Sequence, residues 1–133
     1  MRLWHEDLIP LLPRQQLLGQ HRECCALRGA GWGRPHSTVN YVFDHPKEWL
    51  YCYHTKVLQE MINRGYNSDI LWWIPGYRGK NVKKIPFMDM SIIDEKLGKH
   101  IYPEHNDSYL AECLDNLAGK GIYIKYDKGE HHE

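Results

Sequence analysis

The sequence predicts an all-α fold, a compact three-helix domain with a long irregular segment between the second and third helices. Apolar residues recur at spacings of three and four in three stretches, which is the period of a helix with one buried face. Glycines and prolines stand at the ends of these stretches, where helices start and stop. With 133 residues, 42% of them apolar, the chain is long enough for one hydrophobic core, so residues 1–133 are expected to form a single domain.

The first helix is predicted over residues 13–28. Pro13 suits a first helical position, and Gly29 ends an apolar pattern made of Leu17, Leu18, His21, Cys24, Cys25 and Arg28. The other face carries Gln16, Gly19, Gln20 and Glu23, which share one side by their spacing. A glycine inside a helix costs about 1 kcal/mol relative to alanine. We expect Gly19 to allow the close approach of another backbone, such as the first residues of the chain.

The second helix is predicted to begin near residues 44–46 and to end at Arg64–Gly65, where a cation and a glycine favour termination. Its apolar stripe consists of Leu50, Tyr53, Val57, Leu58, Met61 and Ile62. The third helix begins at residues 106–108 and stops at Gly119 or Gly121, burying Leu110, Cys113, Leu114 and Leu117.

Two shorter segments complete the expected structure. A short helix near residues 92–97, capped by Ser91, interrupts the irregular middle of the chain. Residues 122–126 alternate like an extended segment, but a single strand makes no sheet.

The formal net charge is zero, but it is unevenly distributed. Residues 1–84 contain 12 Lys and Arg against 7 Asp and Glu, whereas residues 85–133 contain 5 against 10. A molecule polarised in this way can bind a polyanion with its basic part. Lys83 and Lys84 close a segment of four cations with no acid, which is either a phosphate-contacting loop or a solvated one.

Composition also argues against several classes of protein. No run of 18 apolar residues or secretory segment is present, so we expect a cytoplasmic protein without a membrane partner. No familiar metal-binding spacing occurs, and we expect no metal and no cofactor. Buried core thiols are favoured over metal ligands for Cys24, Cys25, Cys52 and Cys113. The oligomeric state is open.

Three stretches carry a resemblance to a known family. They are Gln15 to Glu23 together with Arg2, residues 60–67, and residues 102–105. With these residues the chain resembles the phage-type pyrimidine-dimer DNA glycosylase and AP lyase family known as endonuclease V. His36 is similar to a family histidine that precedes the second helix. The linker between the first two helices is shorter here, and a family arginine falls on Ala26, with Arg28 nearby.

The resemblance implies chemistry at the start of the chain. The Met1 α-amine would be the nucleophile and Glu23 its acid/base partner, since a terminal amine has a pKa near 8 and is partly neutral at neutral pH. The partner would be double-stranded DNA containing damaged bases or abasic sites. Its expected contacts are Arg2, Gln15, Arg22, Arg28, His36, Lys83 and Lys84.

Other interpretations stay open. From the residues alone, Arg22–Glu23 is more simply a solvated surface pair. A non-catalytic DNA-binding or protein-binding module on the same fold is one alternative, and an enzyme for a different base lesion is another.

Overall fold

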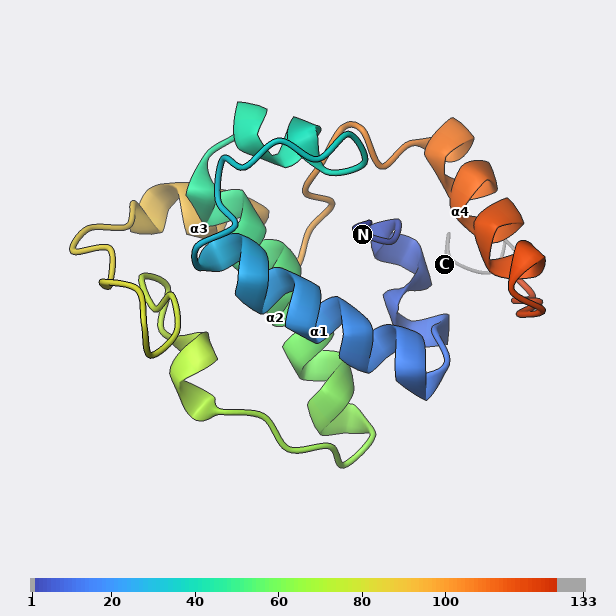
Figure 1. The fold of residues 1–133 in the computed structure, drawn as a ribbon, viewed down its shortest axis with the longest axis horizontal. Helices are drawn as coiled ribbons and strands as arrows, with labels where there is room; N and C mark the ends of the chain where they lie inside the picture. The colour runs from blue at the N-terminus through green and yellow to red at the C-terminus, as the bar shows by residue number, and fades with distance from the viewer. Residues whose placement is uncertain (1, 127–133) are drawn as a thin grey trace.

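The computed structural model describes residues 2–126, and within this range the chain forms four α-helices, three short 3-10 helices and no strand (Figure 1). The α-helices are α1 (Arg14–Arg28), α2 (Lys47–Asn63), α3 (Met90–Lys96) and α4 (Asp107–Gly119). The 3-10 helices are η1 (Glu6–Leu11), η2 (Asn40–Asp44) and η3 (Ile70–Trp73). The predicted all-α class is confirmed, with α3 present as a short fourth helix.

The predicted boundaries of the longer helices agree with the structure to within about three residues. Pro13 and Pro46 are the N-caps of α1 and α2, where a missing backbone N–H does no harm because the first turn has no internal acceptor for it. After α2, Gly65 takes a positive φ of 80°, the left-handed conformation that ends many helices. The Asn106 side chain accepts from the Tyr109 N–H at the start of α4.

Helix α2 lies at the centre of the molecule and packs against α1, α3 and η1. Its buried residues are Leu50, Tyr51, Cys52, Tyr53, His54, Thr55, Val57, Leu58 and Met61, which cover more of its circumference than one stripe. Ile62 is 51% exposed, so the prediction that it joins the buried stripe was wrong. A helix covered on several sides shows a weak amphipathic pattern. The limits of its buried stripe are therefore hard to place from sequence.

The N-terminal segment runs between α1 and α4 (Figure 1). Leu3 and Trp4 are buried, as are Leu110, Cys113 and Leu117 of α4. Leu3, Trp4 and the α4 residues belong to the same hydrophobic cluster as the α1 and α2 core. The first residues of the chain are thus an internal element of the domain.

The remaining segments are irregular. Helix α3 begins two residues before the expected position, because Asp89 rather than Ser91 caps it by accepting from the Ser91 N–H. Residues 122–126 form neither a helix nor a strand. None of the described helices has the length and apolar content that crossing a bilayer requires.

Candidate active site

The side chain of Gln20 on α1 holds the start of the chain in place. Its Oε1 accepts from the Trp4 N–H at 2.6 Å, and its Nε2 donates to the Arg2 carbonyl at 3.0 Å. The Tyr53 hydroxyl of α2 lies 2.7 Å from the Trp4 carbonyl and 2.9 Å from Gln20 Oε1. The Tyr109 hydroxyl of α4 donates to the Leu3 carbonyl. Three helices therefore fix the backbone of residues 2–4.

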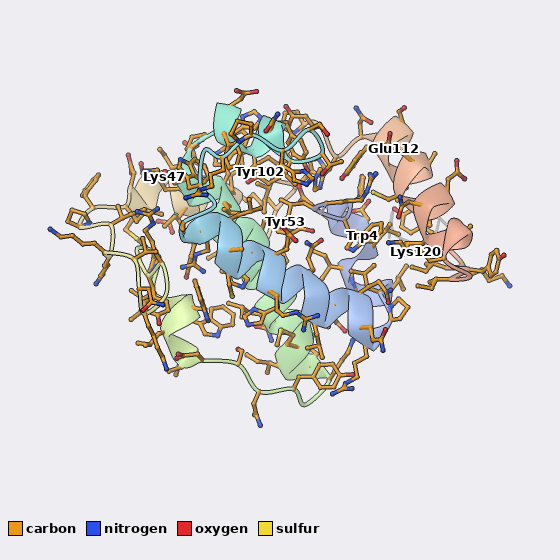
Figure 2. All side chains as sticks on the ribbon, in the orientation of Figure 1. Trp4, Lys47, Tyr53, Tyr102, Glu112 and Lys120 are labelled. Carbon is orange, nitrogen blue, oxygen red and sulfur yellow. The ribbon has the colours of Figure 1, made fainter. Side chains whose placement is uncertain are left out.

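An open cavity of ≈ 390 Å³ lies beside this segment. Two of its lining residues, Trp4 and Lys120, are labelled in Figure 2. Its lining residues come from the N-terminal segment, α1, the loop before η2, and α4: Arg2, Trp4, Gln16, Gly19, Gln20, Glu23, Thr38, Asn116 and Lys120. The cavity brings a carboxylate, two cations and several hydrogen-bonding side chains together, which is what a polar ligand requires.

Glu23 is the one acidic residue that lines this cavity, and it lies one helical turn after Gln20. The residue is half-buried, and its Oε1 is buried without a hydrogen-bond partner among the residues that the structure describes. Burial raises the pKa of the carboxyl above its ordinary value. A buried carboxylate oxygen without a partner is costly in a folded protein and is a sign of a functional group.

Arg2 also lines the cavity, but its guanidinium is already paired. Arg2 Nη1 donates to Glu112 Oε2 of α4 at 3.1 Å, and the Arg2 side chain is only 17% exposed. It also lies above the rings of Trp4 and Tyr109 at 5.9 and 5.8 Å. A phosphate would therefore compete with Glu112 for this cation.

The other expected DNA contacts occupy two regions. Gln15 and Arg22 are exposed on α1, and exposed His36 lies 3.0 Å from the hydroxyl of Thr38, a lining residue of the cavity. Lys83 and Lys84 are exposed in the segment before α3. This segment follows Arg78, which donates to the carbonyls of Arg28 and Gly29 and so lies at the C-terminal end of α1.

Arg28 corrects one expectation. The residue is 7% exposed, and its guanidinium donates to the carbonyls of Trp72, Ile74 and Tyr77 at 2.8 to 3.1 Å. Its Nη1 also lies 2.8 Å from His54 Nδ1. Arg28 therefore holds the loop after η3 against the helices and does not present its charge to DNA.

Gly19 corrects a second expectation. Among residues 2–126, a Cβ at this position would meet only the Nη2 of Arg22, at 3.7 Å, so no backbone within this range approaches it closely. Glycine instead leaves space in the wall of the cavity, because Gly19 is one of the lining residues.

Met1 lies outside the described residues. What the structure brings together is its neighbour Arg2 with Glu23, in one cavity. Asn116 of α4 and Lys120, the C-cap of that helix, were missed from the sequence, since helical spacing does not say what an exposed face meets. Three further side chains that come together, His21, Cys25 and His54, were missed because α2 contributes the third from 29 residues beyond the second.

A comparison with protein families decides the assignment. The family model for pyrimidine dimer DNA glycosylase matches residues 1–74. The chain belongs to this family. No curated protein and no solved structure matches the chain. The part that matches this glycosylase family includes the N-terminal segment, Gln20 and Glu23, whereas Asn116 and Lys120 lie beyond it.

Proposed function

We propose that this protein is a DNA repair glycosylase with associated AP lyase activity, acting on damaged pyrimidines in double-stranded DNA. In this proposal the Met1 α-amine is the nucleophile and Glu23 its acid/base partner. The observation that supports it is the placement of Arg2 by Gln20 in the same cavity as Glu23, whose Oε1 has no hydrogen-bond partner within residues 2–126. Membership of the pyrimidine dimer DNA glycosylase family supports the DNA substrate.

The proposed reaction begins with attack of the neutral amine on C1′ of the deoxyribose. The C1′–base bond breaks, and the base leaves with its bonding electrons. The nitrogen now bound to C1′ loses a proton and the C1′–O4′ bond opens, which gives an imine and a free 4′-hydroxyl. The imine acidifies the C2′ proton, and loss of this proton expels the 3′ phosphate by β-elimination. A terminal amine suits this chemistry because its pKa lies near 8, whereas that of lysine lies near 10.4.

Glu23 would orient or deprotonate the sugar and stabilise the cationic imine. A burial-raised pKa makes this carboxylate a better proton acceptor than a solvated one. No group within residues 2–126 bonds this buried oxygen, so a ligand can contact it without first breaking a bond to these residues.

DNA would lie along the exposed cations beside the cavity. Arg2 and Arg22 would contact phosphates, while Gln15 would contact the edges of bases in the minor groove. His36, Lys83 and Lys84 are proposed as further contacts with the duplex. Enzymes of this chemistry extrude a nucleotide from the stack, and the cavity between α1 and α4 offers room for one.

Borohydride trapping tests the chemistry directly. The untagged protein, incubated with abasic-site DNA and borohydride, should become covalently linked to the strand, because borohydride reduces the imine. Glu23→Gln should lower strand cleavage by about a hundredfold or more, the usual range for loss of a positioned acid/base group. Glu95→Gln, on the exposed surface of α3, is the matched control and should behave as wild type.

The identity of the amine requires a second measurement. An extension of a few residues before Met1 should abolish trapping, while the same extension at the other end of the chain should not. Tryptic mass spectrometry of the trapped species should find the sugar adduct on the first residue. An adduct on Lys120, the other amine at the cavity, would contradict the proposed nucleophile and leave the lyase reaction standing.

The Arg2–Glu112 ion pair favours a second candidate, a DNA-binding or protein-binding module without catalysis, because it occupies the cation that follows the proposed nucleophile in the sequence. Such a module would bind abasic DNA without being trapped. A third candidate, a related enzyme for another lesion, would be trapped on abasic DNA but would release a base other than a pyrimidine dimer.

A further inference from the structure

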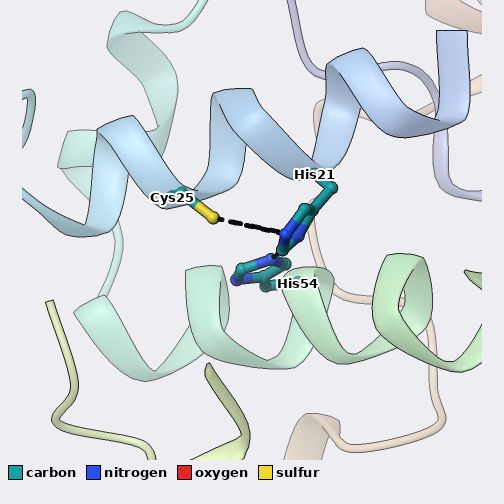
Figure 3. A group of neighbouring side chains, drawn as sticks. All are labelled: His21, Cys25 and His54. Atoms are coloured by element: carbon teal, nitrogen blue, oxygen red, sulfur yellow. Dashed lines mark hydrogen bonds between the residues drawn. The ribbon is translucent and has the colours of Figure 1, made fainter. Parts of the chain in front are cut away.

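A second group of functional side chains lies between α1 and α2. His21 and Cys25 come from α1 and His54 comes from α2, and their side chains point toward one another (Figure 3). His21 and Cys25 each lie two residues from Glu23 along α1. This spacing places them on the side of the helix opposite Glu23. The group is therefore separate from the cavity described above.

The spacing of the three side chains fits one small cation. One ligand atom from each residue can be chosen so that all lie within 4.8 Å of one another. His21 Nδ1 lies 2.9 Å from His54 Nε2, and Cys25 Sγ lies 3.7 to 3.8 Å from the His21 ring nitrogens. Tetrahedral zinc separates two nitrogen ligands by about 3.3 Å and a sulfur from a nitrogen by about 3.6 Å. The third separation, between Cys25 Sγ and the His54 nitrogen, is at most 4.8 Å. Coordination therefore requires the two rings to move slightly apart and the thiol to lie within about 3.6 Å of the His54 nitrogen.

The chemistry of these ligands selects a class of metal. Two imidazoles and a thiolate favour Zn²⁺ and similar borderline or soft ions over Mg²⁺ and Ca²⁺, which take oxygen ligands. His54 is buried, whereas His21 and Cys25 are half-buried, so a cation has access from the side of α1. Three protein ligands leave the fourth position of a tetrahedral ion to solvent.

Without a metal, hydrogen bonds satisfy the same atoms. Arg28 Nη1 lies 2.8 Å from His54 Nδ1, so this nitrogen accepts, and the His54 Nε2–H then donates to His21 Nδ1. Coordination by His54 Nε2 places the ring proton on Nδ1 and ends the contact with Arg28. Arg28 retains its backbone carbonyl acceptors when this happens. Its positive charge weakens the site but does not block it.

We propose that His21, Cys25 and His54 form a binding site for a single Zn²⁺ ion, or another thiophilic divalent cation, which links α1 to α2. The ion takes the place of the Cys25 thiol proton, which is released to solvent, and of the His54 Nε2 proton, which moves to Nδ1 of the same ring. The site is independent of the proposed glycosylase reaction, since none of its ligands lines the cavity at Glu23.

Cobalt(II) gives a readout that does not depend on activity. Titration of the purified, metal-free full chain with Co²⁺ should produce a near-ultraviolet thiolate-to-cobalt charge-transfer band, saturating at one ion per chain. Zn²⁺ should bleach this band and raise the midpoint of thermal unfolding, whereas Mg²⁺ should do neither. The histidine pair His131–His132, outside the described residues, has no thiol and cannot give the band.

Two variants and one control make the result decisive. Cys25→Ser should abolish the band and the zinc-dependent rise in melting temperature, and His21→Gln should weaken both. Cys24→Ala is the matched control, because Cys24 is adjacent in sequence but fully buried in the core, and it should retain the band. A folded wild-type protein that gives no band would overturn the proposed site. A band that survives Cys25→Ser would also overturn it, because another thiol would then be the ligand.

Discussion

At the scale of single residues, Gln20 fixes the position of the N-terminal segment. Its amide makes hydrogen bonds to the backbone of Arg2 and Trp4 from the middle of α1. No property of the sequence distinguishes it from Gln15 or Gln16, since all three are glutamines on one helix. Its role depends on what lies above the helix face, which helical periodicity does not specify.

Gln20→Ala should therefore affect both stability and chemistry. Loss of the amide leaves the buried Trp4 N–H without an acceptor, at a cost of about 1 to 3 kcal/mol in the free energy of unfolding. The rate of strand cleavage at abasic sites should fall further than this destabilisation explains, because residues 2–4 lose their position next to the proposed nucleophile. Urea unfolding and single-turnover cleavage measure the two effects.

The control for this prediction is Gln59→Ala. Gln59 is exposed on α2 and donates to Asn63 one turn later, so its loss should change stability by a few tenths of a kcal/mol and leave cleavage unchanged. Equal losses of cleavage in both variants would indicate that Gln20 does not position the amine.

Glu112→Gln should strengthen DNA binding. Removing this carboxylate frees the guanidinium of Arg2 for a phosphate, which adds one counterion-releasing contact. The dissociation constant for abasic duplex should fall several-fold, and the slope of log K against log salt should steepen by about 0.9. Asp115→Asn changes the net charge equally from an exposed position on α4, so a similar effect there would mean that only total charge matters.

At the scale of elements, the helices were predictable and the segments between them were not. The start and end of α2 follow from local signals, namely Pro46, Arg64 and Gly65. The loop after η3 instead takes its path from Arg28, 44 residues before Trp72, through hydrogen bonds to its carbonyls. Such a contact leaves no mark in the local sequence of the loop. The same Arg28 appeared in sequence to be a DNA contact, because an arginine at a helix end shows no sign of burial.

Arg28→Ala should destabilise the protein by about 3 to 5 kcal/mol. It leaves several loop carbonyls and His54 Nδ1 without the donor that now satisfies them. The measurement is urea unfolding, with exposed Arg34→Ala as the control for loss of one positive charge. In the fraction that remains folded, the salt dependence of DNA binding should be unchanged. A smaller slope of log K against log salt in Arg28→Ala would instead show that Arg28 contacts DNA.

At the scale of the whole molecule, buried neutral histidines make stability depend on pH. His105 is 2% exposed, accepts from the Glu6 N–H at Nδ1, and lies 2.7 Å from the Tyr41 hydroxyl at Nε2. Burial lowers its pKa to about 2, and burial also lowers the pKa of His54 strongly. In the unfolded chain both would titrate near 6.5. Their contribution to stability is therefore present above pH 6.5 and is lost as the pH falls below it.

The free energy of unfolding should accordingly decrease as the pH is lowered from about 7 to about 5. Each buried histidine contributes up to about 1.4 kcal/mol per pH unit below its unfolded pKa. Glu6, whose pKa burial raises, acts in the opposite direction, so the test compares slopes between variants. His105→Gln keeps a hydrogen-bond acceptor and a donor. It should reduce the slope of the free energy of unfolding against pH by up to the amount that one proton contributes. His36→Gln, at an exposed histidine, should leave this slope unchanged. Equal slopes in the wild type and both variants would mean that His105 is protonated in the folded state.

The hydrogen bonds of residues 2–4 come from positions 20, 53 and 109 of the chain. A ribosome makes residues 2–4 long before it makes Tyr109, so these residues find all of their partners only after α4 has been synthesised. A nascent chain that still lacks α4 leaves the Leu3 carbonyl unpaired and the cavity without the wall that carries Asn116 and Lys120. If the proposed reaction holds, reactivity of the Met1 amine toward a sugar would thus be withheld until α4 has been synthesised and has packed against residues 2–4.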